Sequence, residues 1–523
     1  MPDSAGNTLL VLGLATCVLV YLWIYRWRQG GRVGPKAWPL IGSLLEIRAN
    51  AHRVHDWMYD YMSKSPTGTF SFKLPPYRFI SVGRPDNVEY ILKTNFSNYI
   101  KGPMFQQHYE DLMGNGIFVA DGDVWRQHRK IASYEFSSEK LRESSTEVYR
   151  VYALHLMLFL ETIADSERQV DIQDLFLRMT MGSICKIAFG VDQHMLSPEL
   201  PEFEFATVFD TLTMLTVKRS LDPFWKVKRK LNVGREKKFR ALRPVVEKFT
   251  YDVIRLRRAE LAELEAMGKT LEKQDLLSRF MSAKDANGES LSDKVLRDAV
   301  LNFLIAGRDT SASTLSWFVY LLCVNPEVAK RCFQEIQEVF GDEQNDLGQG
   351  TDRFYQFGKL LTYESLGRLH YLHAAISETL RLYPPVARSS KVASNQSPDS
   401  KHAVKDDILP DGTVVKAGER VVYVPYSMGR LELVWGPDAW KYRPERWLKD
   451  GCYKAESPFK FSVFQAGPRI CLGKDTAYLQ MLMTSAMFIR WFHFELVPNQ
   501  SVTYKVSLIL AIKNGLKVFA RHR

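Results

Sequence analysis

The sequence predicts a mainly α-helical protein with small β-sheets, preceded by one helix that spans a membrane. Three observations support this fold class. From about Glu139 to Leu380, apolar residues recur at i, i+3 and i+4, which is the period of helices packed on a core. Short segments with strand character lie on either side of this helical region, and an apolar run lies near the N-terminus.

Length and composition fit this class and exclude others. The 523 residues, with 46% hydrophobic and 25% charged, can bury a large core. The net charge of +11 is spread along the chain, so we expect an anionic membrane or an acidic protein as partner, and no nucleic acid. The six cysteines show no C-x-x-C spacing, which predicts neither a zinc site nor a disulfide framework and is typical of a cytosol-facing compartment.

The N-terminal apolar run, Leu9–Tyr25, is seventeen residues long and is followed by Arg26, Arg28 and Arg32. A cleaved signal peptide is the alternative, but the positive charges follow the run and no basic region precedes it. The positive-inside rule then predicts that residues 1–30 form a single-pass anchor with the rest of the chain in the cytosol.

Residues 31–45 are predicted to form a proline-rich hinge, and residues 46–523 one large domain. The segment Gly34–Gly42 holds two prolines and two glycines, which disfavour a helix and favour a stiff bend.

Two regions of the large domain have strand character. Near its start, strands are predicted at Thr69–Phe72 and Arg78–Val82, followed by a helix at Pro85–Thr94. Near its end, Thr413–Val424 is predicted to form two valine-rich arms joined by a turn at Lys416–Glu419.

A long helix is predicted from Ser292, a good N-cap, to Cys323, where Asn325-Pro326 ends it. At roughly thirty residues it is long enough to cross a domain. A second membrane span is excluded by four charged residues within it, Arg297, Asp298, Arg308 and Asp309.

This helix is interrupted at Ala306–Ser311. Gly307 weakens the helix, and the Thr310 hydroxyl can bond back to the Ala306 carbonyl and bend it. A hydroxyl with the Asp309 carboxylate beside it suits a relay that delivers protons. The alternative is a glycine kink in a core helix.

One cysteine, Cys471, lies in the glycine-bounded segment Phe464–Gly473. Gly467 and Gly473 can take a positive φ and leave room for a flat cofactor. The N-terminus of a predicted helix at Lys474–Ile489 would stabilise a thiolate. Such a thiolate suits the axial position of a heme iron, whereas the alternative is a small buried hydrophobe.

The frame F-x-x-G-x-R-x-C-x-G around Cys471 and the segment A-G-x-D-T-[ST] at Ala306–Ser311 resemble the heme loop and the oxygen-activation motif of the cytochrome P-450 family. The resemblance implies the cytochrome P-450 fold and a heme b cofactor whose iron takes the Cys471 thiolate as its ligand. It also implies that Thr310 and Asp309 are catalytic residues that manage protons, and that Ala306 lies at the cofactor.

Two further motifs resemble the same family. Glu378 and Arg381 share a helix face, and the segment Tyr442–Trp447 adds Arg446. The family resemblance implies a buried triad with a structural role, whereas the alternative is a weak surface ion pair.

Trp125 and Arg129, at i, i+4, resemble the family pair whose indole N–H and guanidinium bind heme propionates. The resemblance adds four further candidates for propionate contacts: Arg388, Arg469, Lys101 and His128.

The implied reaction inserts one atom of O2 into a C–H bond. No G-x-G-x-x-G fingerprint follows a strand, so we expect electrons from a separate NADPH-dependent cytochrome P-450 reductase. The resemblance to microsomal members implies the endoplasmic reticulum membrane, with residues 46–523 as a cytosolic catalytic domain.

Three segments resemble plant fatty-acid ω-hydroxylases: Ile305–Thr310, Pro223–Arg229 and Ala466–Asp475. The apolar segment Pro201–Val217 and the basic segment Asp222–Arg240 would flank an access channel suited to a medium- to long-chain fatty acid. Alternatives are a monooxygenase of a sterol, terpenoid or phenolic, and a non-catalytic membrane heme sensor or carrier. A proton relay argues against a sensor.

Overall fold

The chain forms two compact units in a computed structural model. The structure describes residues 4–27, 33–136, 138–192, 195–197, 199–269, 275–284, 288–341, 350–393 and 406–523. The sheet unit consists of Met1–Ile100, Arg388–Trp440 and Ala466–Pro468. The helical unit consists of Lys101–Ala387, Lys441–Gln465 and Arg469–Arg523.

The sheet unit holds most of the strands. Its strands are β1 (Thr69–Leu74), β2 (Tyr77–Val82), β3 (Tyr99–Ile100), β5 (Ser389–Ala393), β6 (Asp407–Ile408), β7 (Val414–Val415) and β8 (Arg420–Tyr423). Its helices are α1 (Ser4–Trp27), α2 (Leu44–Ala49), η1 (Ala51–Arg53), α3 (Val54–Met62), α4 (Pro85–Glu89), η2 (Tyr90–Thr94), η3 (Phe96–Asn98), α19 (Pro425–Met428) and α20 (Glu432–Trp435).

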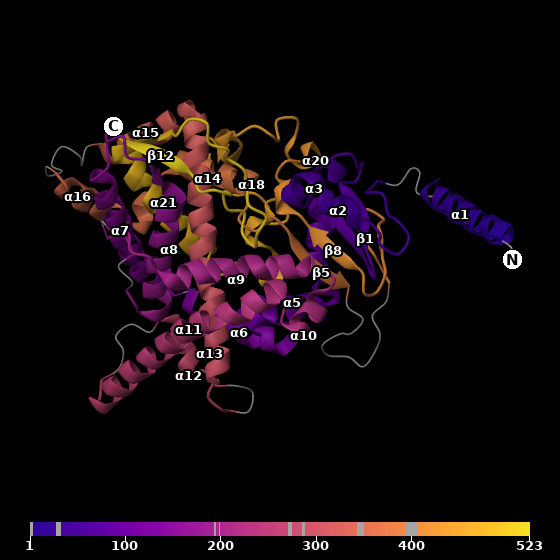
Figure 1. Cartoon of the computed structure of the whole chain (residues 1–523). Coiled ribbons are helices and arrows are strands. Elements are labelled where there is room, and N and C mark those ends of the chain that lie inside the picture. The colour runs from indigo at the N-terminus through magenta and orange to yellow at the C-terminus, as the bar shows by residue number, and fades with distance from the viewer. Residues whose placement is uncertain are drawn as a thin grey trace. The chain divides into compact units, whose positions relative to one another are not determined.

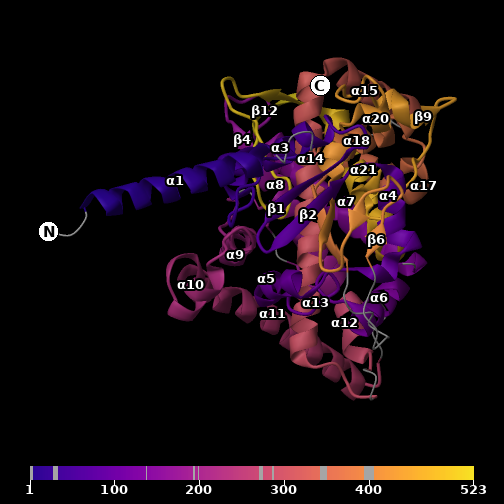
Figure 2. The same ribbon diagram turned by 90° about the vertical axis from the view of Figure 1, so that its right-hand side faces the viewer.

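Five of these strands form one sheet in the order β1-β2-β8-β5-β3. The antiparallel pair β1 and β2 runs in register from Thr69 opposite Val82 to Leu74 opposite Tyr77 (Figure 2). β8 is buried along its whole length and lies parallel to β2 and antiparallel to β5. The two strands predicted near the start of the domain are therefore confirmed.

The two valine-rich arms and the turn predicted near the end of the domain are confirmed as β7, β8 and the turn between them. The turn is present, since the Glu419 N–H donates to the Lys416 carbonyl. However, β7 pairs with β6, and β8 pairs with β2 and β5. β8 consists of buried residues and lies in the middle of a sheet, where β2 and β5, both distant in the sequence, pair with its two edges.

α1 covers the whole predicted span Leu9–Tyr25 as one helix. Within the part of the chain that the structure describes, no helix is both long and apolar enough to cross a membrane. Of the positive charges predicted to follow the span, Arg28 and Arg32 lie outside the described residues. The predicted helix at Pro85–Thr94 is present as α4 followed by the wider turn η2.

The helical unit contains the remaining elements. Its helices are α5 (Pro103–Met113), α6 (Gly122–Phe136), α7 (Glu139–Glu161), α8 (Ile172–Phe189), α9 (Glu204–Ser220), α10 (Trp225–Leu231), α11 (Gly234–Ala266), α12 (Leu276–Ser282), α13 (Asp293–Leu304), η4 (Ile305–Asp309), α14 (Thr310–Val324), α15 (Pro326–Phe340), α16 (Asp352–Leu360), α17 (Tyr363–Leu366), α18 (His370–Leu382), η6 (Pro444–Trp447), η7 (Ser462–Phe464) and α21 (Lys474–Trp491). Its strands are β4 (Val170–Asp171), β9 (Leu448–Lys449), β10 (Cys452–Tyr453), β11 (Phe492–Leu496) and β12 (Lys517–His522). The short helix η8 (Gly467–Arg469) belongs to both units.

Helical periodicity explains how this unit packs. α15 buries Val328, Cys332, Ile336 and Phe340, which are four residues apart and form one apolar stripe. α14 packs against α8, α18 and α21, and α7 packs against α8 and α21 (Figure 1). The prediction of a mainly α-helical protein with small sheets is confirmed.

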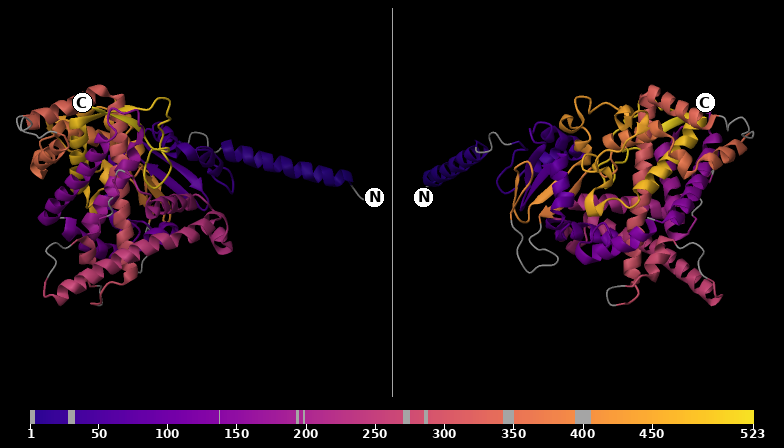
Figure 3. Two further views of the ribbon diagram at one scale, coloured as in Figure 1. Left: turned by 60° about the vertical axis from the view of Figure 1, so that its left-hand side comes forward. Right: turned by 180° about the vertical axis from the view of Figure 1, so that it is seen from behind.

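The predicted long helix is present as α13, η4 and α14, which follow one another along nearly one line (Figure 3). Ser292 occupies the N-cap position with an extended backbone, but its side chain makes no capping hydrogen bond. α14 ends at Val324, just before Asn325-Pro326, as predicted.

Candidate active site

The break in the long helix is a π-helical turn. η4 widens the helix at Ile305–Asp309, and the Thr310 hydroxyl donates to the Ala306 carbonyl at 2.7 Å. A Cβ on Gly307 would lie 2.6 Å from the Cδ1 and Cγ1 atoms of Ile184 on α8, so glycine allows this close approach. Ala306, Gly307 and Thr310 stay partly accessible in a helix that is otherwise almost fully buried. The predicted interruption and the predicted back-bond from Thr310 are confirmed, but the helix stays nearly straight (Figure 3), and the wider turn leaves an accessible face.

The Asp309 carboxylate is held by its neighbour. Arg308 donates from Nη1 to Asp309 Oδ1 at 2.9 Å and to Asp210 Oδ1 at 2.5 Å, and from Nη2 to Asp210 Oδ2 at 3.2 Å. Burial raises the pKa of Asp309 to about 6, although the Arg308 charge opposes the rise. Asp309 can therefore exchange a proton near neutral pH. Asp210, on α9, was not found from the sequence because nothing in its local pattern marks it.

The cysteine loop is closed by backbone contacts. The Cys471 N–H donates to the Phe464 carbonyl at 2.8 Å. Gly467 has a φ of 62°, as predicted. Gly473 does not: its φ is −87°, because it forms the N-cap of α21. The predicted following helix is confirmed as α21.

The Cys471 side chain is exposed, and charges and N–H groups surround its sulfur. Desolvation by the surrounding protein raises the pKa of the thiol. A hydrogen bond from the Gly473 N–H and the charge of Arg129 oppose this rise. An accessible sulfur that receives an N–H and lies near a cation is suited to binding a metal as a thiolate.

Replacing Gly467 with alanine should destabilise the folded protein by roughly 2 kcal/mol or more. The new Cβ would lie 1.9 Å from the Leu92 carbonyl oxygen, and the backbone would keep a positive φ. Urea unfolding measures the loss. Gly473→Ala is the control, because its Cβ would meet only Phe136, at 3.5 Å, and should leave stability nearly unchanged. Equal effects of the two substitutions would contradict this reading of the loop.

Three basic side chains predicted to bind propionates gather in the helical unit. Arg129 donates from Nη1 to the Ile470 carbonyl at 2.5 Å. Arg469 donates to the Asp121 carboxylate at 2.8 Å, and its guanidinium lies 4.5 Å from the centre of the Trp125 ring. Desolvation and the Arg469 charge lower the pKa of Lys101 to about 8. Trp125, Arg129 and Arg469 are thus brought close to the cysteine loop, together with Lys101.

Asp121 organises this cluster, although sequence reasoning did not find it. Besides binding Arg469, it accepts the N–H groups of Lys101 and Gly102 at 3.1 Å and 2.9 Å. The cluster therefore holds three cations and one carboxylate. Partly buried cations in excess call for further anions, and the two propionates of a heme would supply them. The residues present fit this cofactor, with Cys471 as the thiolate ligand.

Two other candidates were predicted to bind the propionates, Arg388 and His128. Arg388 belongs to the sheet unit and immediately precedes β5, so its role in propionate binding stays a prediction. His128 lies on α6 with its ring 6.2 Å from that of Phe280, and burial lowers its pKa. A neutral histidine in an apolar setting is a poor partner for a carboxylate.

The predicted buried triad is present in the helical unit. Glu378 receives Arg381 Nε at 2.7 Å and Arg446 Nε at 2.8 Å. The side chains of Glu378 and Arg381 have no exposed surface. The alternative of a weak surface pair is therefore excluded.

Comparison with known proteins identifies relatives over almost the whole length. The sequence pattern of the family described as Cytochrome P450 matches residues 33–518. Cytochrome P450 704B1 of Arabidopsis thaliana is 46% identical over 98% of this chain and 99% of its own length. Cytochrome P450 704C1 of Pinus taeda is 41% identical over 98% and 96%, and Cytochrome P450 86B1 of Arabidopsis thaliana is 39% identical over 97% and 89%.

Proposed function

Because the chain belongs to the cytochrome P450 family of heme-thiolate monooxygenases, we propose that it hydroxylates the terminal carbon of medium- to long-chain fatty acids. The observation that carries the monooxygenase reaction is that one unit, the helical unit, holds both an exposed Cys471 and the accessible face of Ala306 and Thr310. The fatty-acid substrate is supported by segments such as Pro223–Arg229 that resemble plant ω-hydroxylases.

The cofactor in this proposal is heme b. Cys471 would supply the thiolate ligand, and Trp125, Arg129 and Arg469 would hold the propionates, with Lys101 adding charge. The bound heme, with O2 and electrons that originate from NADPH, supplies the oxidising power for C–H hydroxylation. The protein residues orient the cofactor and neutralise its acid groups.

Proton delivery is the role proposed for Thr310 and Asp309. The Thr310 hydroxyl donates its one hydrogen to the Ala306 carbonyl, so its oxygen is free to accept a proton, and it can pass its own hydrogen on when it turns away from Ala306. Asp309 is the source because its carboxyl titrates close to neutral pH.

An Arg308→Gln variant should keep its turnover to a higher pH than the wild type does. Burial raises the pKa of Asp309 to about 6 and the Arg308 charge lowers it, so removing that charge raises it further. The carboxyl then stays protonated to a higher pH, and because the protonated form is the proton source, the alkaline limb of the turnover profile moves upward by roughly one unit or more. Arg308→Lys, which keeps the charge, should move the limb less. An unmoved alkaline limb in Arg308→Gln would contradict Asp309 as the proton source.

Electrons are proposed to come from a separate NADPH-cytochrome P450 reductase. The support is the net charge of +11, which gives surplus lysines and arginines for an acidic partner. Replacing exposed lysines on the cysteine side should weaken coupling to the reductase at low salt. Coupling that is unaffected by both substitution and salt would contradict this docking mode.

The chain is further proposed to reside on the endoplasmic reticulum membrane, with residues 46–523 in the cytosol. The support is the apolar composition of Leu9–Tyr25 and the exposed apolar side chains of α1, including Leu14, Leu19 and Trp23. Carbonate extraction of microsomes tests this proposal. Full-length chain should stay with the membrane pellet, and release of most of the protein would contradict attachment through α1.

Product identity decides the substrate class. Microsomes with a plant reductase and NADPH are offered fatty acids of several lengths, a sterol and a cinnamic-type acid. We expect a terminal-hydroxy fatty acid as the main product. Absence of fatty-acid turnover, in a preparation that shows the thiolate–heme carbonyl absorption band, would overturn the substrate class, while NADPH consumption at background with every compound would indicate a sensor or carrier.

A further inference from the structure

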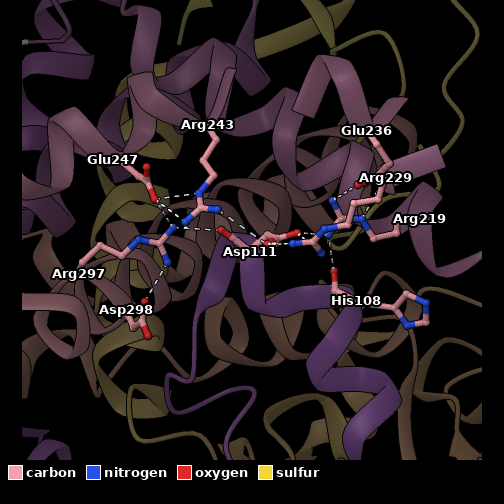
Figure 4. A network of polar contacts seen from close by, with 9 residues as sticks. All are labelled: His108, Asp111, Arg219, Arg229, Glu236, Arg243, Glu247, Arg297 and Asp298. Atoms are coloured by element: carbon pink, nitrogen blue, oxygen red, sulfur yellow. Dashed lines mark hydrogen bonds and ion pairs between the residues drawn. The ribbon is translucent and has the colours of Figure 1, made fainter. Parts of the chain in front are cut away.

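Three arginines from three helices converge on one carboxylate, Asp111 of α5 (Figure 4). Arg219 of α9 places Nη1 2.7 Å from Asp111 Oδ2. Arg229 of α10 binds it with both nitrogens of its fork, at 2.9 Å to each oxygen. Arg243 of α11 places Nη1 3.9 Å from Oδ1. We call these four residues the Asp111 cluster.

The three arginines differ in what else holds them. Arg219 is buried and also binds both oxygens of Glu236, at 2.8 Å and 2.7 Å. Arg243 also binds Glu247 at 2.7 Å. Among the residues that the structure describes, Asp111 is the only carboxylate within ion-pair distance of Arg229. The side chain of Arg229 is nevertheless 39% exposed, so an anion from solution can approach it.

Asp111 belongs to a different element from the arginines. If α5 moves away, Arg219 and Arg243 keep their glutamates, and Arg229 alone loses its carboxylate partner. An accessible guanidinium with a planar fork is then available to any other carboxylate. Exchange of one carboxylate for another conserves the charge balance of the cluster, so the guanidinium of Arg229 is not left without a counter-ion.

Two helices connect the Asp111 cluster to the candidate active site. On α9, Arg219 follows Asp210, the partner of Arg308, by nine residues, which is about 14 Å of helix. On α13, Arg297 donates to the Asp111 carbonyl at 3.1 Å. It precedes Asp309 by twelve residues, which is roughly 18 Å of helix. An extended acyl chain has a length of the same order.

We propose that Arg229, aided by Arg243, binds the carboxylate of the fatty-acid substrate, which takes the place of Asp111. The inference rests on the proposed function and adds where the acid group is recognised. The acid group is thereby held away from Thr310, and the far end of the chain is the part that reaches the site of oxidation. Recognition at this distance favours attack at the terminal carbon.

Competition between two carboxylates predicts effects of opposite sign. Arg229→Gln removes the binding group, so a fatty acid should bind about tenfold more weakly. Asp111→Asn removes the internal competitor, so the same acid should bind several-fold more tightly. If the Asp111 cluster only ties helices together, both substitutions break the same contact and should weaken binding together.

The experiment measures ligand binding by the heme absorption change in the purified, heme-loaded full chain. The ligands are a saturated fatty acid and the primary alcohol of the same chain length, which lacks the charge. Arg229→Gln should weaken binding of the acid and leave binding of the alcohol unchanged. Lys230→Gln, which removes a charge from the exposed neighbouring residue, should change neither by more than about twofold. Arg229→Lys should recover part of the loss.

Three results would overturn the inference. The first is an Arg229→Gln variant that loses the same affinity for the acid and for the alcohol. The second is an Asp111→Asn variant that binds the acid more weakly than the wild type does. The third is a Lys230→Gln variant that loses as much affinity for the acid as Arg229→Gln does. Arg229 is partly exposed, so its variants should fold and still test the inference even if Asp111→Asn folds poorly. If the wild type binds the acid and the alcohol but forms no terminal-hydroxy product, the proposed function fails while the recognition site stands. If the wild type does not bind the acid, both fail.

Discussion

A Glu378→Gln variant should lose about 3–5 kcal/mol of unfolding free energy, the largest effect on stability that we expect from a single residue. Arg381 binds Glu378 with Nε and Nη2, each at 2.7 Å, and Arg446 adds its Nε at 2.8 Å. The Trp447 indole N–H and the Arg443 N–H donate to the same carboxylate at 2.9 Å each. Five donors therefore meet two oxygens.

Glutamine has the same shape but fits this setting badly. Its amide nitrogen would face donors, so several N–H groups would lose their acceptor. The side chain of Arg381 has no exposed surface and that of Arg446 has 8%, so the two guanidiniums would keep their charges without a counter-ion. An uncompensated buried charge costs more than the pair itself contributes.

Denaturant unfolding of the heme-loaded chain measures the effect, with Glu139→Gln as the control. Glu139 and Arg142 are also three residues apart on one helix, but their side chains are 76% and 43% exposed. Loss of this exposed ion pair in Glu139→Gln should change the free energy of unfolding little. If Glu378→Gln unfolds at the same denaturant concentration as Glu139→Gln, the buried triad is not the stabilising element that its geometry indicates.

Features that depend on residues close in sequence could be predicted. The hydrogen bond from Thr310 to Ala306 spans one helical turn, so its spacing alone specifies it. The pair of Glu378 and Arg381 is likewise set by helical geometry. The positive φ of Gly467 follows from the tightness of its loop.

Features that depend on distant segments could not be predicted. Asp121 joins the cation cluster through Arg469, which lies far along the chain, and no local pattern marks it. Asp210 reaches Arg308 only because α9 packs near the π-helical turn. The strand partners of the two arms around Lys416 could not be predicted for the same reason, since β8 pairs with β2 and β5.

A Cys471→Ser variant should lose the thiolate–heme carbonyl absorption band and show turnover at background, the largest effect on activity that we expect. A serine hydroxyl does not ionise near neutral pH, so it cannot supply the electron-rich sulfur ligand. The Gly473 N–H and the Arg129 charge, which favour a thiolate, would then act on a neutral oxygen.

The chain should still fold in this variant, which makes the loss a chemical one. The loop is closed by the backbone bond from Cys471 N–H to the Phe464 carbonyl, and this bond does not involve the sulfur. Cys452→Ser, at an exposed cysteine of β10, is the matched control and should keep both the band and the turnover. If Cys471→Ser keeps the thiolate band, another cysteine is the ligand. If it loses the band but keeps turnover, oxidation does not depend on the thiolate, and the reaction assigned to this site is wrong.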